Sequence, residues 1–161
     1  MALVPKRGVP LQRAIDRALR VVTLGGQDRY LTEYVTTLGD TIYLPDGWDA
    51  LPARTRYLIL RHETVHLDQF VRWGWLGMIV LYGLVPLPVG LAYGRARLEW
   101  EAYAETLRAT AEVDGPEAAR APELADEIVA RFTGPDYAWM WPFPGQVRRW
   151  IAACLGTLPT P

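Results

Sequence analysis

The sequence predicts an α+β fold that is mostly helical and forms a single domain over residues 1–161. Three observations lead to this prediction. Apolar side chains recur at the three- and four-residue spacing of amphipathic helices over much of the chain. Two short segments before residue 45 are rich in β-branched and aromatic residues and are separated by a Gly-Asp turn. The chain has 161 residues, half of them hydrophobic, which is enough for one buried core.

The first half of the chain is expected to combine helices with a β-hairpin. A first helix is predicted over Pro10–Leu24, where the pair Gly25-Gly26 ends it. Tyr30–Leu38 and Thr41–Leu44 are predicted as the two strands of the hairpin. A long helix with an apolar core side is then expected from about Pro52 to Trp73.

The second half starts with an apolar run, Trp73–Gly94, that contains no charged residue. A helical pattern follows from Arg95 to about Val113, and a shorter amphipathic helix is expected over Glu123–Phe132. Tyr137–Pro144 is rich in aromatic residues and proline, and Val147–Leu155 is expected to form a final short helix.

Composition and charge argue against several classes of protein. A formal net charge of −1 and the lack of a basic run argue against nucleic acid as a partner. Cys154 is the only cysteine, which excludes an intramolecular disulfide and a cysteine-rich zinc site and fits a reducing compartment. No apolar run of signal-peptide length follows Lys6 and Arg7. We therefore expect a cytoplasmic protein, with membrane association as the alternative.

The only two histidines of the chain, His62 and His66, lie four residues apart, and Glu63 directly follows the first. This H-E-x-x-H pattern falls on the long helix expected before Trp73. Because residues i and i+4 share a helix face, the two imidazoles can bind one metal ion. Glu63 is then placed to take a proton from a water on that metal. The pattern predicts a catalytic metal site, and a helix with two incidental histidines is the alternative.

A catalytic zinc site needs three protein ligands, and the chain has no third histidine. The remaining ligand is expected to be a carboxylate on the helix that starts at Arg95. Glu99 and Glu101 point about 200° apart on that helix, so only one of them can face the metal. Glu99 shares its face with small, mostly uncharged residues, whereas Glu101 shares its face with charged ones. We therefore expect Glu99 to be the ligand, with Glu101 as the alternative.

His62-Glu63-Thr64-Val65-His66, followed by Glu99-Trp100-Glu101-Ala102-Tyr103, resembles the gluzincin zinc metallopeptidases, in particular minimal or membrane-linked ones. The resemblance covers roughly residues 41–113. It implies a zincin-like fold with a small sheet, an active-site helix and a glutamate helix. It also implies that His62, His66 and Glu99 bind zinc, that Glu63 is the general base, and that the substrate is a peptide or protein. In such folds an edge strand pairs with the extended substrate, and Thr41–Leu44 is expected to be that strand.

One position departs from the family pattern. Tyr103 stands where the family has an aspartate that orients a ligand histidine, and a tyrosine oxygen is the acceptor that this position offers instead. If Glu101 were the ligand, Glu105 would occupy the acidic position. Gln69, near one turn beyond His66, is expected either to cap a polar pocket or to contact the substrate or the metal shell.

The apolar run Trp73–Gly94 is long enough to span a bilayer. A single span would place His66 and Glu99 on opposite sides of about 30 Å of hydrocarbon, so they could not share a metal ion. The run is therefore expected to fold back near Pro86-Leu87-Pro88. It would then form either a buried or interface-forming cover or a membrane-surface contact.

These observations predict a zinc-dependent peptide-bond hydrolase with Glu63 as general base. The catalytic core is expected at about residues 30–113, and residues 114–161 are expected to form a helical and aromatic cover. Within that cover, Tyr137–Pro144 is either a lid that seals the core or a plug over the cleft. The alternative function is a zinc-binding but inactive or latent module with a structural or interaction role, associated with membranes in one variant of this hypothesis.

Overall fold

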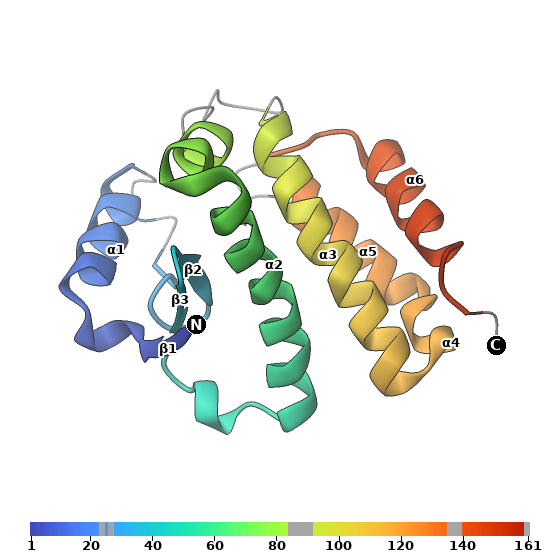
Figure 1. Ribbon diagram of the computed structural model, residues 1–161, viewed down its shortest axis with the longest axis horizontal. Helices are drawn as coiled ribbons and strands as arrows, with labels where there is room; N and C mark the ends of the chain where they lie inside the picture. The colour runs from blue at the N-terminus through green and yellow to red at the C-terminus, as the bar shows by residue number, and fades with distance from the viewer. Residues whose placement is uncertain (23–24, 26–27, 84–91, 135–139, 160–161) are drawn as a thin grey trace.

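Figure 1 shows the computed structural model, which describes residues 1–22, 25, 28–83, 92–134 and 140–159. The elements follow the order β1 (Ala2–Pro5), the 3₁₀ helix η1 (Lys6–Gly8), α1 (Pro10–Val22), β2 (Thr36–Leu38), β3 (Thr41–Leu44), the 3₁₀ helix η2 (Trp48–Ala50), α2 (Ala53–Met78), the π-helical turn η3 (Ile79–Gly83), α3 (Tyr93–Asp114), α4 (Pro116–Ala119), α5 (Pro122–Thr133) and α6 (Pro144–Leu155). The predicted α+β class with a mostly helical content is confirmed.

The sheet has three strands in the order β1-β3-β2. β2 and β3 form the predicted antiparallel hairpin, with Thr37 opposite Ile42, and β1 pairs with β3 in parallel. β2 is shorter than the predicted strand Tyr30–Leu38. The chain before it makes a turn in which the amide of Glu33 donates to the carbonyl of Arg29 at 2.9 Å.

The expectation that Thr41–Leu44 is the substrate-binding edge strand is wrong. This segment is β3, and it lies in the centre of the sheet with a partner on each side. Its second partner, β1, escaped sequence analysis because its four residues are mostly exposed and carry no clear alternation. In the part of the chain that the structure describes, β2 is the edge strand that contacts α2.

α2 begins where it was predicted and continues past Trp73, but Gly74 interrupts its helical path. The backbone at Gly74 has φ 64° and ψ 176°, a conformation that glycine adopts far more readily than other residues. The last part of α2 therefore bends away from the axis of its longer first part, as the upper end of the helix shows in Figure 1. η3 extends this bent part of the chain.

The two described ends of the apolar run lie against each other. A side chain on Gly94 would place its Cβ 2.9 Å from the carbonyl oxygen of Leu81, so the absence of one permits this close approach. The expected reversal near Pro86-Leu87-Pro88 lies outside the described residues. None of the helices that the structure describes has both the length and the apolar character that crossing a bilayer requires.

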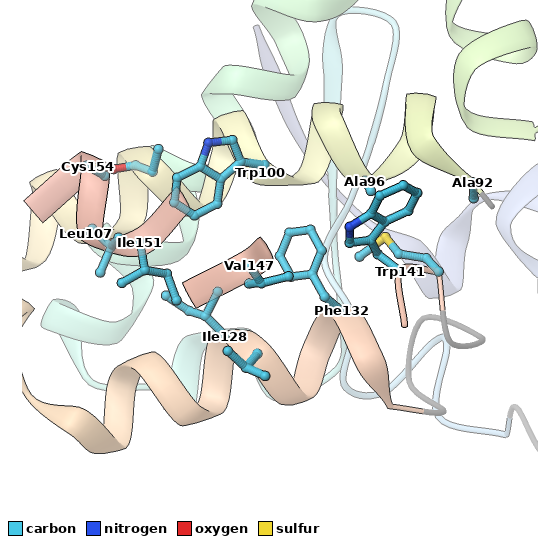
Figure 2. Close-up of a cluster of buried hydrophobic side chains, with 13 residues drawn as sticks. Ala92, Ala96, Trp100, Leu107, Ile128, Phe132, Trp141, Val147, Ile151 and Cys154 are labelled. Carbon is cyan, nitrogen blue, oxygen red and sulfur yellow. Dashed lines mark hydrogen bonds between the residues drawn. The ribbon is translucent and has the colours of Figure 1, made fainter. Parts of the chain in front are cut away.

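α3 separates two parts of the molecule. α2, the sheet and α1 lie on one side of it, and α5 and α6 lie on the other (Figure 1). Figure 2 shows Trp100, Ile128 and Phe132 in the buried apolar cluster that α3 forms with α5 and α6. Tight packing of this cluster fixes α3, and thereby the residues on its opposite face.

Two residues of the predicted aromatic segment belong to this core, whereas Phe143 is exposed. Met140 and Trp141 are buried in the cluster, and the Trp141 ring contacts Trp150 at a centroid distance of 6.4 Å. These two residues are part of the core, and the choice between a lid and a plug for the whole segment stays a prediction. Tyr137 and Trp139 lie outside the described residues.

Candidate metal centre

His62 and His66 lie one turn apart on α2 and face Glu99 on α3. Glu99 Oε2 is 3.8 Å from His62 Nε2 and 3.9 Å from His66 Nε2. One ligand atom from each of the three side chains lies within 4.8 Å of the others. Glu99 is 1% exposed and His66 8% exposed, so the donors meet in the interior between the two helices.

A small residue lies one turn beyond Glu99. Ala102 is fully buried on α3, and such a side chain lets a neighbouring helix approach closely. The structure places Glu99, and not Glu101, beside the histidines. Glu101 instead accepts a hydrogen bond from Gln69 Nε2 at 3.0 Å and forms an ion pair with Arg72 at 3.3 Å.

The ring of His66 is held by Gln69, whose side chain is fully buried. Gln69 Nε2 donates to the Leu98 carbonyl at 2.9 Å, which leaves its Oε1 to face His66 Nδ1 at 2.9 Å. An amide oxygen only accepts, so Nδ1 carries the proton and the lone pair of Nε2 points toward Glu99. This arrangement is compatible with both expectations for Gln69, a cap on a polar pocket and a contact with the metal shell.

The ring of His62 is held in the same way by Thr106. The Thr106 hydroxyl donates to the Ala102 carbonyl at 3.2 Å and lies 3.1 Å from His62 Nδ1, from which it accepts. Tyr103 packs its ring edge-on against the imidazole, with a centroid distance of 4.8 Å. The polar partner of His62 Nδ1 is thus Thr106, three residues beyond Tyr103 on α3.

Negative charge surrounds His66. Burial lowers the pKa of its imidazole, but the Glu99 and Glu63 carboxylates, the hydrogen bond with Gln69 and the Glu101 charge together raise it above its ordinary value. A cation at this position is thus favoured by its surroundings. A divalent metal ion would meet the same field.

Glu63 approaches the site from the side of the sheet. Its side chain is buried, and its Oε2 accepts a hydrogen bond from Thr37 Oγ1 on β2 at 2.7 Å. The contact between α2 and β2 thereby fixes the orientation of the carboxylate. Thr37 was missed by sequence analysis, because nothing local to the hairpin indicates which side chain it meets on α2.

Glu63 and the three proposed ligands line one cavity of about 480 Å³. Most of its wall is apolar or aromatic and comes from α1, the segment before β2, β2 itself and the bent end of α2. The described residues of the wall are Ile15, Leu19, Tyr30, Tyr34, Val35, Thr36, Thr37, Leu38, His62, Glu63, His66, Phe70, Trp75, Met78, Ile79, Arg95 and Glu99. An apolar cleft with a few convergent polar groups is typical of a small-molecule or peptide site.

A second buried polar group, Lys6, contacts Tyr30, which is a residue of the cavity wall. Lys6 is 1% exposed, and its Nζ donates to the Tyr30 carbonyl at 2.9 Å and lies 3.6 Å from the Tyr30 ring centroid. Burial lowers the pKa of Lys6 to about 7, although the Glu63 and Asp16 carboxylates act in the opposite direction. Nothing in the sequence indicates that Lys6 is buried, because it is a single lysine next to Arg7 near the start of the chain.

No protein-family model, curated protein or solved structure matches this chain. The predicted donors His62, His66 and Glu99 are together, and the predicted base Glu63 lines the same cavity.

Proposed function

We propose that the protein is a zinc-dependent peptide-bond hydrolase with a zincin-like arrangement of its sheet and helices. His62, His66 and Glu99 are the zinc ligands, and Glu63 is the general base. One observation carries this proposal: two imidazole Nε2 atoms and one carboxylate oxygen converge within 4.8 Å at the wall of a cavity. The base lines that cavity as well.

The donor set fits zinc. Zinc bonds to imidazole nitrogen and carboxylate oxygen are roughly 2.0–2.2 Å long, so tetrahedral ligand atoms lie about 3.4 Å apart. The Glu99 oxygen lies 3.8 and 3.9 Å from the two imidazole nitrogens, and all three ligand atoms lie within 4.8 Å of one another, so side-chain rotations would draw them together on zinc. Calcium and magnesium prefer all-oxygen sites, whereas imidazole suits zinc and its transition-metal neighbours.

The residues of the chain divide the work of hydrolysis. When bound, zinc supplies Lewis-acid polarisation of the substrate carbonyl and lowers the pKa of the attacking water. The Glu63 carboxylate, oriented by Thr37, takes the proton of that water and delivers it to the leaving amine. Gln69 and Thr106 keep both imidazoles in the tautomer that presents Nε2. The apolar wall excludes bulk water from the reacting groups.

The substrate is proposed to lie along β2. This strand pairs with β3 on one side, and its residues Thr36, Thr37 and Leu38 line the cavity. An extended peptide can add to the edge of such a strand through main-chain hydrogen bonds. β2 thus takes the role that sequence analysis gave to the following strand.

A zinc-binding module with an interaction role is the second candidate. Large apolar side chains are exposed around the bend of α2, with Val71 at 88% and Leu76 at 75% exposure and both Trp73 and Trp75 near half. Exposed apolar patches of this kind mark contacts with proteins or membranes. A membrane-surface contact through residues 73–94 belongs to this candidate, as does a cytoplasmic location with membrane association.

Two measurements test the proposed function. Elemental analysis of protein purified without added metal is expected to give about one zinc per chain. Glu63→Gln is then expected to keep the zinc and abolish hydrolysis of a peptide library, whereas Asp68→Asn, an exposed change on the same helix, leaves both unchanged. Full zinc content without hydrolysis in the wild-type protein would favour the second candidate, and no zinc after supplementation would refute both.

A further inference from the structure

The cavity contains one cationic side chain that zinc binding and proton transfer do not use. Arg95 lies on α3, one turn before Glu99, and its side chain lines the same cavity. Among the described lining residues it is the one with a permanent positive charge. All other charged groups of the described wall belong to the proposed metal and proton-transfer machinery.

Arg95 lies near the bent part of α2. Trp75, Met78 and Ile79 follow the interruption at Gly74 and line the cavity together with Arg95. The close contact between Leu81 and Gly94, the residue before Arg95, joins η3 to the start of α3. This end of the cavity therefore combines one guanidinium with apolar side chains.

A guanidinium binds a carboxylate through two parallel hydrogen bonds, and an enclosed apolar wall strengthens that interaction. Four residues separate Arg95 from Glu99, a rise of about 6 Å along α3. One residue of an extended peptide spans about 3.3–3.6 Å, and the arginine side chain adjusts the remainder. A carboxylate one residue beyond the scissile bond thus falls within the reach of Arg95.

We propose that Arg95 binds the C-terminal carboxylate of a peptide substrate and makes the protein a carboxypeptidase. This inference rests on the proposed zinc hydrolase function and names its substrate class. Water adds across the last peptide bond: the carbonyl carbon gains the hydroxyl, the C–N bond breaks, and the amine leaves with a proton. Trp75, Met78 and Ile79 select an apolar or aromatic last residue.

A purely structural role for Arg95 makes a different prediction. Side chains at i and i+4 are neighbours on a helix, so Arg95 could act only on Glu99. Its loss would then change zinc affinity and reduce the cleavage of every substrate to the same degree. If Arg95 instead binds the substrate carboxylate, its loss reduces the cleavage of only those substrates that have a free C-terminus.

The test compares N-acetyl-Ala-Ala-Phe with its C-terminal amide. With wild-type protein, the free acid is expected to be cleaved and the amide to be cleaved at least about 10-fold more slowly. Arg95→Met is expected to lower kcat/KM for the acid by about 10- to 100-fold and to leave the amide unchanged. Arg95→Lys retains the positive charge but cannot form two parallel hydrogen bonds, so its kcat/KM for the acid should lie between those of the wild type and Arg95→Met. Arg108→Met, an exposed arginine of α3 paired with Glu105, is the matched control.

A binding measurement separates this proposal from the proposed function. Zinc-loaded Glu63→Gln protein, with and without Arg95→Met, is titrated with both peptides by calorimetry, after circular dichroism has verified folding. Tighter binding of the acid that disappears with Arg95→Met supports the carboxylate contact of Arg95, and together with hydrolysis of the acid by the wild-type protein it supports the carboxypeptidase. Equal binding of acid and amide, or an equal loss for both in the Arg95 variants, would overturn it while leaving zinc hydrolysis intact. Where zinc is absent, the same titration of the metal-free protein decides by the same criterion.

Discussion

The two histidines of the proposed zinc site depend on hydrogen bonds from their other ring nitrogens. Gln69 holds His66 from the next turn of the same helix, and Thr106 holds His62 from the neighbouring helix. Such contacts fix the tautomer and the orientation of a ligand before the metal arrives. The contact of His66 is local in sequence, so Gln69 could be singled out from the sequence. The contact of His62 joins residues 44 positions apart, so Thr106 could not.

Replacing Thr106 with valine removes the acceptor for His62 Nδ1 while keeping the shape of the side chain. We expect zinc affinity to fall by about 10- to 100-fold, measured by competition with a chelator. Thr110→Val, one turn further along α3, removes a buried hydroxyl that bonds to the Thr106 carbonyl and is the control. Equal affinities in the two variants would show that Thr106 does not orient the ligand.

Thr37 holds the proposed base and not a proposed ligand, so its replacement has a different signature. We expect Thr37→Val to lower kcat about 10-fold with little change in KM or zinc content, because Glu63 loses its fixed orientation. Thr41→Val, whose hydroxyl bonds to Asp40 at 2.9 Å, is the control on the neighbouring strand. A loss of zinc in Thr37→Val would instead indicate damage to the ligands.

Lys6 makes the stability of the fold depend on pH. Its pKa is lowered from 10.5 to about 7, so between these values the unfolded chain binds more protons than the folded one. The free energy of unfolding therefore rises with pH across this window, by up to about 1.4 kcal/mol per unit, and the slope disappears below it. Urea unfolding of wild-type and Lys6→Met proteins at about pH 7 and about pH 9 isolates this contribution. A difference between the two proteins that stays constant with pH would contradict it.

Among the elements, α2 decides the shape of the cavity because it changes direction within its length. Sequence analysis predicted that this helix ends at about Trp73, whereas α2 continues to Met78 with an interruption at Gly74. Helices were predicted well since their apolar periodicity is a local property. The pairing of β1 with β3 was not, because strand partners far apart in sequence leave no local pattern.

Gly74→Ala tests the bend directly. A side chain at φ 64° and ψ 176° is strained, so we expect a loss of about 1–3 kcal/mol in the free energy of unfolding. Gly145→Ala in α6, where an added Cβ meets nothing within 4 Å, is the control and should be neutral or stabilising. Urea denaturation measures both, and equal stability of the two variants would mean that α2 can straighten at no cost.

At the scale of the whole molecule, the donors of the proposed zinc site come from two helices, α2 and α3, that are separated in the sequence. The H-E-x-x-H pattern could be found from sequence alone, and the faces of α3 favoured Glu99 over Glu101. The cavity around them could not be predicted, because α1, β2 and the bent end of α2 meet there only in the folded chain.

Zinc should therefore stabilise the fold by bridging α2 and α3. At a free zinc concentration of 100 times Kd we expect about 2.7 kcal/mol of additional stability, seen as a rise in Tm. Glu99→Gln should abolish most of the rise, while Glu101→Gln, which leaves the three donors in place, should preserve it. The opposite order would transfer the ligand role to Glu101.

Tyr103 has a consequence for any attempt to move this site into another protein. Its ring contacts His62 on one side at 4.8 Å and Phe132 of the apolar cluster on the other at 5.6 Å between centroids. A graft of α2 and α3 alone would carry every proposed ligand. It would lack Phe132, against which Tyr103 packs while it contacts the His62 ring. The smallest transplantable unit for the three ligands is therefore three helices, since Phe132 of α5 packs against the tyrosine, and the base needs β2 as well.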